Sequence, residues 1–458
     1  MKTANQYIFA IVIFICFQSC NSPKETSMNQ PAKDKVTIMS LDPGHFHAGL
    51  IHKTMYPHVD STVHVFAPAG AELDDYIKRI AGYNSRGESP TAWKIEVEKG
   101  GDFLEKMISK KPGNVMVVAG KNDRKIDYIS AAIANGIHVY ADKPLVINQE
   151  GFQKLVKAFE SASQKNLLLY DIMTERFEIA SLLQRELSML PEVFGELETG
   201  SLENPAITKE SVHHFFKYVS GNPLIRPDWF FDVNQEGEGI VDVTTHLVDL
   251  IQWEAFPNVV LDTTDVEMLA AKRWPTLLSL SQFKQVTGKE EFPEFLQKYL
   301  NGENLEVFCN GEMNYTLKGK HAKVSVIWNF EAPEGAGDTH YSMMRGTKAN
   351  LIIRQGKEEN FKPTLYVALL SGKTEALENA ISSTLQSEYP GLRLEKQKNG
   401  EYLIVIPDSY HIGHEAHFGQ VTEQFLEYFK SGKMPDWEVP NMIVKYYTTT
   451  KALEKARE

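Results

Sequence analysis

Two short segments of this chain carry side chains that suit proton-transfer chemistry. The first is Asp142-Lys143-Pro144, which follows a short apolar run. The second holds Asp242 and His246, four residues apart among apolar neighbours. A carboxylate one helical turn from a histidine can fix the imidazole tautomer and raise its basicity, as a proton-transfer catalyst requires. The lysine can donate a hydrogen bond to an oxygen on which negative charge develops.

The elements that must position these side chains alternate between strands and helices from residue 36 onward. Apolar runs predict strands at 36–41, 62–67, 114–119, 138–141 and 167–170, with a further one at 94–97. This alternation indicates a parallel, doubly wound α/β sheet, whose ligand crevice lies at the carboxyl ends of its strands. Lys143 stands at such an end. We therefore expect a nucleotide-binding domain over 36–172.

The rhythm changes after residue 172, so we assign residues 173–458 to a second, α+β domain. Within it, residues 237–249 are expected to be helical. The i+4 and i+7 spacing would then place Asp242, His246 and Asp249 on one face.

Several motifs together resemble one known family. The chain holds Gly120-Lys121-Asn122-Asp123-Arg124-Lys125, then Gly136-Ile137-His138-Val139, then Asp142-Lys143-Pro144. These segments resemble the Thr-Pro-Asn-x-x-His, Gly-Lys-His-Val and Glu-Lys-Pro motifs of the Gfo/Idh/MocA oxidoreductases, with Lys125 in place of the histidine. Residues 237–246 resemble that family's Gly-Gly-x-x-x-Asp-x-Gly-x-His helix.

The resemblance implies a fold and a catalytic trio. The fold would be an N-terminal Rossmann domain with a doubly wound parallel sheet, followed by a C-terminal α+β domain with a large, mostly antiparallel sheet. The family uses a nicotinamide dinucleotide to oxidise sugars and cyclitols, and it often forms homo-oligomers through the second domain. Carried over, the catalytic residues would be Lys143, Asp242 and His246.

The expected cofactor site departs from the family pattern at its first turn. Met39 and Leu41 stand where the first two glycines of Gly-x-Gly-x-x-Gly belong, although Gly44 matches the third. Asp42 beside this turn is expected to cap the following helix. No acid for the ribose hydroxyls follows the second strand directly, although Glu72 comes a little later, and no arginine stands at that turn to favour a 2′-phosphate. We expect NAD, without excluding NADP, held by Gly44, His45, His47, Asn122, Asp142 and Lys143.

Aromatic and polar residues between the two chemical segments suit a sugar ring. The candidates for substrate binding are Arg176, His213, His214 and Trp229. His213 and His214, with Asp242 and His246, also offer imidazole and carboxylate ligands for a divalent metal. Because adjacent strand residues point to opposite faces, we expect no metal site.

The N-terminus and the composition bound the location and the partners. Residues 1–19 form an expected signal peptide, and Cys20 stands where a bacterial lipoprotein is lipidated, followed by a flexible tether over 20–35. We therefore expect a lipid-anchored protein of the bacterial cell envelope, whose only membrane contact is its anchor. The formal net charge of −12 argues against a nucleic-acid partner.

The sequence leaves three functions open. The first is a nicotinamide-dependent oxidoreductase that acts on a secondary hydroxyl of a sugar or glycoside. The second is an NAD-dependent glycosidase, in which transient oxidation permits elimination of the aglycone and is then reversed. The third is a sugar-binding lipoprotein without catalysis, which the lost glycines favour. Stoichiometric dinucleotide released from the purified protein would separate the third function from the other two.

Overall fold

A computed structural model describes residues 35–219 and 222–458, and residues 35–458 form one compact unit. The predicted signal peptide 1–19, Cys20 and the tether up to residue 34 lie outside the described residues. Among the residues that are described, no helix combines the length and the apolar character needed to cross a bilayer.

The first sheet is parallel and, in the described part of the chain, has six strands in the order β3-β2-β1-β4-β5-β6. The strands are β1 (Ile38–Leu41), β2 (Thr62–Ala67), β3 (Lys94–Lys99), β4 (Val115–Val118), β5 (His138–Asp142) and β6 (Leu169–Ile172). The intervening helices are α1 (His47–Leu50), α2 (Ala71–Ser85), α3 (Phe103–Lys110), α4 (Lys125–Ala134) and α5 (Gln149–Gln164). This order confirms the predicted Rossmann sheet and places the crevice at the carboxyl ends of the adjacent strands β1 and β4, where the strand order reverses.

The apolar runs explain why these strands lie in the middle of the fold. Every residue of β1, β4 and β6 is buried, as expected for a parallel sheet covered by helices on both faces. On α4, Ile126, Ile129 and Ile133 recur at helical spacing and are all buried.

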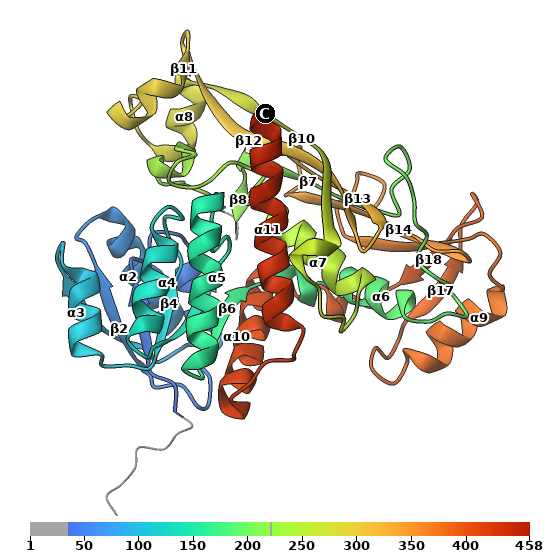
Figure 1. Cartoon of the computed structure of the whole chain (residues 1–458), viewed down its shortest axis with the longest axis horizontal. Helices are drawn as coiled ribbons and strands as arrows, with labels where there is room; N and C mark the ends of the chain where they lie inside the picture. Colours follow the sequence, from blue (N-terminus) through green and yellow to red (C-terminus); the bar gives the residue numbers. More distant parts are fainter. Residues whose placement is uncertain (1–34, 220–221) are drawn as a thin grey trace, which may run out of the picture. The chain divides into compact units, whose positions relative to one another are not determined.

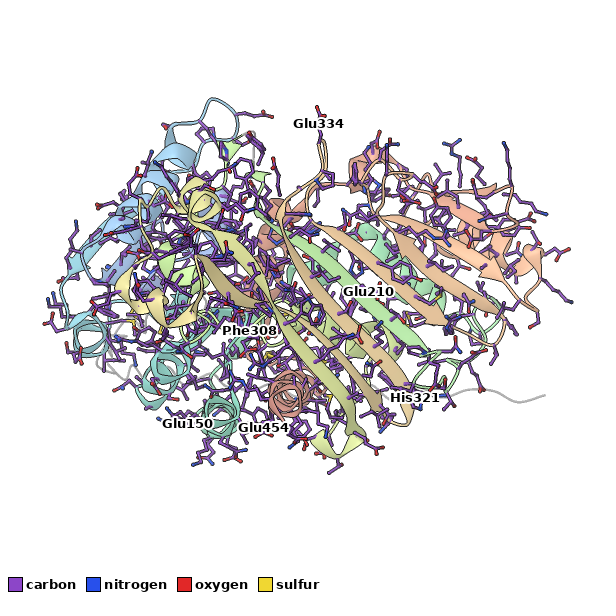
Figure 2. All side chains as sticks on the ribbon, turned by 90° about the horizontal axis from the view of Figure 1, so that it is seen from above. Glu150, Glu210, Phe308, His321, Glu334 and Glu454 are labelled. Carbon is purple, nitrogen blue, oxygen red and sulfur yellow. The ribbon has the colours of Figure 1, made fainter. Side chains whose placement is uncertain are left out.

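The second sheet is large and mostly antiparallel, as predicted. Over the described residues its strand order is β10-β12-β13-β7-β14-β15-β16-β18-β17, with β11 paired to β12, and only the β13–β7 pair in it is parallel. Its strands are β7 (Ile207–Phe216), β10 (Val266–Ser279), β11 (Leu300–Asn301), β12 (Asn304–Leu317), β13 (Lys320–Glu331), β14 (Thr339–Arg345), β15 (Ala349–Arg354), β16 (Thr364–Leu369), β17 (Arg393–Lys396) and β18 (Tyr402–Val405). Figure 2 looks onto this sheet, with Glu210 of β7 and Phe308 of β12 labelled. A separate short hairpin pairs β8 (Tyr218–Val219) with β9 (Asn222–Pro223).

Helices join the two sheets. The remaining helices are α6 (Ile179–Ser188), α7 (Thr244–Ala255), α8 (Leu280–Thr287), α9 (Thr374–Asn379), α10 (His414–Ser431) and α11 (Glu438–Arg457). Figure 1 shows α11 running between the first sheet and the second, and it packs against both α5 and β10. Phe418, Val421 and Phe425 of α10 belong to the hydrophobic core of the first sheet. The last two helices therefore complete the core of the nucleotide-binding half, although they come at the end of the chain.

Candidate active site

Lys143 and Asp242 form the centre of the site. Lys143 follows the last residue of β5, and its Nζ donates to Asp242 Oδ1 at 2.5 Å. The two side chains are only 12% and 9% exposed. Burial acts to lower the pKa of Lys143, but the charges of Asp242 and Asp142 outweigh it, so the pKa is raised. The lysine is therefore held as an ammonium at the carboxyl end of the sheet.

Lys125 fixes the strand end that carries Lys143. Its fully buried Nζ donates to Asn122 Oδ1 at 2.6 Å, to the Asp142 carbonyl at 2.8 Å and to the Pro144 carbonyl at 3.0 Å. Burial lowers the pKa of Lys125 to about 8. Since the three acceptors come from the β4–α4 connection and the end of β5, Lys125 joins these segments beneath the site.

The sequence predicted that Asn122 binds the cofactor, but the structure places its side chain in a buried contact with Glu236. The residue is buried, and its Nδ2 donates to the Glu236 carbonyl at 2.7 Å and to Glu236 Oε2 at 3.2 Å. Its backbone N–H donates to the Gln235 carbonyl. Asn122 thus attaches the first sheet to the segment that leads into α7. The residue that matches the family motif therefore packs the two halves of the molecule together.

In the turn between β1 and α1, backbone N–H groups are already hydrogen-bonded to carbonyl groups of the protein. The Gly44 N–H donates to the Asp42 carbonyl at 2.8 Å, and the His45 N–H donates to the Ala119 carbonyl at 3.1 Å. The backbone N–H groups of Gly44 and His45 are therefore used within the fold and do not face a cofactor phosphate. Asp42 has φ of 47° and accepts from the Tyr128 hydroxyl, so it does not cap α1 as expected.

His45 and His47 both approach the carboxylate of Asp142. His47 Nδ1 lies 2.9 Å from Asp142 Oδ2, and His45 Nδ1 lies 3.6 Å from the same oxygen. Burial is the largest cause that holds the pKa of each imidazole well below its usual value. These three side chains lie next to Lys143 and contribute two neutral imidazoles to the site.

The predicted arrangement of Asp242, His246 and Asp249 on one helical face is wrong. Helix α7 begins at Thr244, so Asp242 lies in the turn before it and contacts Lys143 instead of His246. The turn is fixed by Gly239, where an added Cβ would lie 1.6 Å from the Cys309 carbonyl oxygen of β12. His246 Nδ1 is buried without a hydrogen-bond partner in the described residues. Burial and Lys143 hold the pKa of His246 well below its usual value.

Arg176 was expected to bind the substrate, but it lies in a buried network of ion pairs. Its guanidinium donates to both oxygens of Asp249 at 2.7 Å and to Glu438 at 2.8 Å. Lys445 also donates to Asp249. The network connects α7 to α11 and to the segment after β6. Arg176 and Asp249 are therefore structural residues.

His213 and His214 belong to strand β7 of the second sheet, and both contact Asp338. His213 Nδ1 lies 2.9 Å from Asp338 Oδ2, and its ring stacks on Trp328 with the centroids 5.0 Å apart. The His214 N–H donates to Asp338 Oδ1, and Lys217 also pairs with this carboxylate. His213 and Lys217 line the cavity described next.

One cavity of about 850 Å³ brings most of these groups together. Its charged walls are mixed in sign, and six aromatic side chains, Phe46, Tyr218, Phe230, Trp328, Phe361 and Tyr410, complete them. Eight histidines line it: His45, His47, His213, His246, His340, His411, His414 and His417. The volume, the mixed charge and the aromatic faces suit a neutral, polyhydroxylated ligand.

Two domain families match the chain. The sequence model described as "Oxidoreductase family, NAD-binding Rossmann fold" matches residues 76–170. The one described as "Putative oxidoreductase C terminal domain" matches residues 183–457, more than half of the chain. The chain belongs to the Gfo/Idh/MocA oxidoreductase family. The Rossmann match begins at residue 76, after the β1–α1 region in which Met39 and Leu41 replace the first two glycines of the family pattern.

Solved structures agree with this membership. A putative oxidoreductase from Parabacteroides merdae ATCC 43184 shares 54% identity over 93% of this chain and 98% of its own, with a TM-score of 0.90. Levoglucosan dehydrogenase in complex with NADH and levoglucosan shares 12% identity over 92% of this chain and 97% of its own, with a TM-score of 0.58. A 3-ketoreductase from Actinomadura kijaniata in complex with NADP shares 11% over 92% and 98%, with a TM-score of 0.53. The last two show the fold alone. No curated protein matches the chain.

The side chains around the β1–α1 turn fit a dinucleotide, although the backbone N–H groups of Gly44 and His45 do not face it. Trp229 is 2% exposed, and its Cζ2 would lie 3.6 Å from a Cβ on Gly44, so the sequence-based placement of Trp229 in the sugar subsite is wrong. Its indole N–H has no partner in the described residues, and Lys121 Nζ lies 6.0 Å from the ring centroid. An unpaired N–H beside an ammonium suits a phosphate oxygen. Glu72 also reaches this turn, with its Cγ 3.9 Å from that Cβ position, and its carboxylate suits ribose hydroxyls.

Sequence reasoning missed several residues that the family fold brings to the site. Glu236 lines the cavity, and burial, then the nearby Asp242, raise its pKa well above the usual value. Asp338 pairs with His213 from a position 125 residues away, and Arg226 donates to the His214 carbonyl. Glu236 had a local signal, because it directly precedes the glycine-containing motif at 237–246, and Arg226 begins the aromatic segment that contains Trp229. Asp338 had no such signal.

Proposed function

We propose that this protein is a nicotinamide-dependent oxidoreductase that oxidises or reduces a secondary hydroxyl of a sugar or glycoside. The observation that carries the proposal is the buried Lys143–Asp242 pair in the same cavity as His246. A bound nicotinamide supplies the hydride acceptor or donor. The substrate class is supported by the cavity's mixed charge and aromatic walls, and by the levoglucosan bound in one structural neighbour.

The chain's own residues would divide the proton chemistry as follows. The ammonium of Lys143 donates a hydrogen bond to the reacting oxygen and stabilises the charge that develops on it. The imidazole of His246, which is neutral because its pKa lies well below the usual value, accepts the hydroxyl proton in the oxidation direction. Asp242 holds the Lys143 ammonium in place. This assignment replaces the sequence-based mechanism in which Asp242 oriented His246.

The dinucleotide would be held by Lys121, the Trp229 indole N–H and Glu72. A carboxylate at the ribose position repels a 2′-phosphate, so we propose NAD as the preferred cofactor. The test is mass spectrometry of the small molecules released from denatured protein, followed by calorimetric titration of the emptied protein with NAD and with NADP. NAD release or tight NAD binding supports the proposal. A protein that binds neither dinucleotide contradicts it.

The location and the assembly are proposals that rest on the sequence and the family. We propose that Cys20 is lipidated and anchors the protein in the bacterial envelope, and that the chain forms a homo-oligomer. Mass spectrometry of the N-terminal peptide from native membranes tests the first point, with Cys20→Ser as the control. Light scattering of the mature chain tests the second.

A further inference from the structure

His45, His47 and Asp142 form a compact group of potential metal ligands. One donor atom from each side chain can be chosen so that all lie within 4.8 Å of one another. His47 Nδ1 and His45 Nδ1 lie 2.9 Å and 3.6 Å from the same oxygen of Asp142. Ligand atoms around a tetrahedral metal ion, at bond lengths near 2.1 Å, are separated by about 3.4 Å. The group therefore needs only small movements to close around an ion.

The backbone holds the three side chains in place. Asp142 is the last residue of β5, and its carbonyl accepts from buried Lys125 at 2.8 Å. His47 is the first residue of α1, and His47 and Asp142 are both buried. The His45 side chain is 17% exposed, and both imidazoles line the cavity. His45 lies in the bend before α1, where its backbone N–H donates to the Ala119 carbonyl. Two histidines and one carboxylate leave at least one coordination position for a further ligand.

Lys143, Lys125, Lys217 and Arg226 are the cations that act on the two imidazoles. Lys143 is paired with Asp242 at 2.5 Å and Lys217 with Asp338, while the Lys125 ammonium is held by carbonyl and amide oxygens. These partners offset part of the repulsion that a bound cation would meet. The alternative role for the group is a simple hydrogen bond that fixes the His47 tautomer. That role explains the 2.9 Å contact but gives no reason for a second imidazole at His45.

We propose that His45, His47 and Asp142 bind one divalent transition-metal ion, such as Zn²⁺, at the wall of the active-site cavity. Imidazole with carboxylate suits several such ions. An oxygen of the cavity's occupant completes the coordination shell, which places a Lewis acid beside Lys143. The proposal does not depend on the oxidoreductase function, because metal uptake and dinucleotide binding are measured separately.

The test uses the mature chain without an affinity tag, stripped with a chelator and then dialysed against Zn²⁺. Elemental mass spectrometry should find about one Zn²⁺ per chain. His45→Gln and His47→Gln should each lower the affinity by more than the ~10–100-fold that is typical of a change outside the coordination shell. His58→Gln is the matched control, because its side chain is exposed and only its carbonyl oxygen is used in the structure.

A second readout separates loss of the site from loss of the fold. Co²⁺ bound by imidazole and carboxylate gives visible absorption bands, which should be present in the wild type and in His58→Gln and be absent in His45→Gln. Circular dichroism should be the same for all four proteins. The proposal is overturned if the wild type takes up no stoichiometric Zn²⁺, or if the His45 and His47 variants retain it.

Discussion

Asp242 Oδ1 accepts a hydrogen bond from Lys143 Nζ at 2.5 Å, although the two residues are 99 positions apart. Both side chains are almost fully buried, and they come from different halves of the molecule. The pair therefore couples the end of β5 to the turn before α7, and it sets the charge of the lysine that faces the cavity.

Replacing Asp242 with Asn should change both the stability and the pH profile. Removing one partner of a buried ion pair leaves an uncompensated charge and costs about 3–5 kcal/mol. Without Asp242, burial lowers the pKa of Lys143 with less opposition, so the alkaline limb of kcat/KM should move to lower pH. Denaturant unfolding and the pH profile check the two effects.

The control variant Asp75→Asn breaks an exposed ion pair with Arg79 and should lower the free energy of unfolding by less than about 1 kcal/mol. An unmoved alkaline limb in Asp242→Asn would count against the assignment.

Replacing His246 with Gln should remove the proton acceptor and leave the fold intact. The loss of general-base catalysis should lower kcat/KM by about 10²–10⁴-fold, with little change in NAD affinity. Because the pKa of His246 lies well below 6.5, wild-type activity should not fall as the pH passes through that value. Steady-state kinetics and calorimetry provide the two readouts. Full activity in His246→Gln would show that another group accepts the proton.

Replacing Trp229 with Phe should weaken dinucleotide binding and spare sugar binding. A hydrogen bond to a charged group contributes about 1.5–3 kcal/mol, so the NAD affinity should fall by about 10–100-fold. An aromatic ring remains at this position, but the indole atom Cζ2 that lies against Gly44 is lost, so circular dichroism should confirm that the variant is folded. Glu72→Gln should in turn reduce the preference for NAD over NADP. Equal NAD affinity in the wild type and Trp229→Phe would place the phosphate elsewhere.

Replacing Arg176 with Met tests whether this arginine is structural, as its contacts indicate. Burial acts to raise the pKa of Asp249, but Arg176 and Lys445 outweigh it and hold the pKa below its usual value. This contribution to stability is fully present above the unfolded pKa, about 3.9, and is lost as the pH falls through the lower folded value. The variant should lose about 3–5 kcal/mol at neutral pH, and the difference should shrink below about pH 4. The KM for the sugar, measured where the variant is folded, should not change; a large rise in KM would return Arg176 to the substrate site.

The chain order of strands and helices could be predicted because each element is encoded locally. The apolar runs of β1, β4 and β5 were visible in the sequence, as was the helical spacing of Ile126, Ile129 and Ile133. The position of Lys143 at a strand end followed from the same run. The resemblance to the family then supplied the second, mostly antiparallel sheet.

The partners of the charged side chains could not be predicted, because they depend on contacts between distant segments. The start of α7 is one example. The spacing of Asp242 and His246 suggested one helix, but Gly239 is pressed against the Cys309 carbonyl of β12, so the helix begins only at Thr244. That displacement turns Asp242 toward Lys143.

The sequence by itself determined the family, the two kinds of sheet and the segments that carry the chemistry, since these depend on periodicity and on short motifs. The tertiary structure alone decided that Arg176 lies in a buried network, that Trp229 packs on the β1–α1 turn, and that His45 and His47 contact Asp142. The physical reason is that burial and pairing are properties of the assembled chain. A charged or aromatic side chain has the same local sequence signature whether it faces a ligand or the interior.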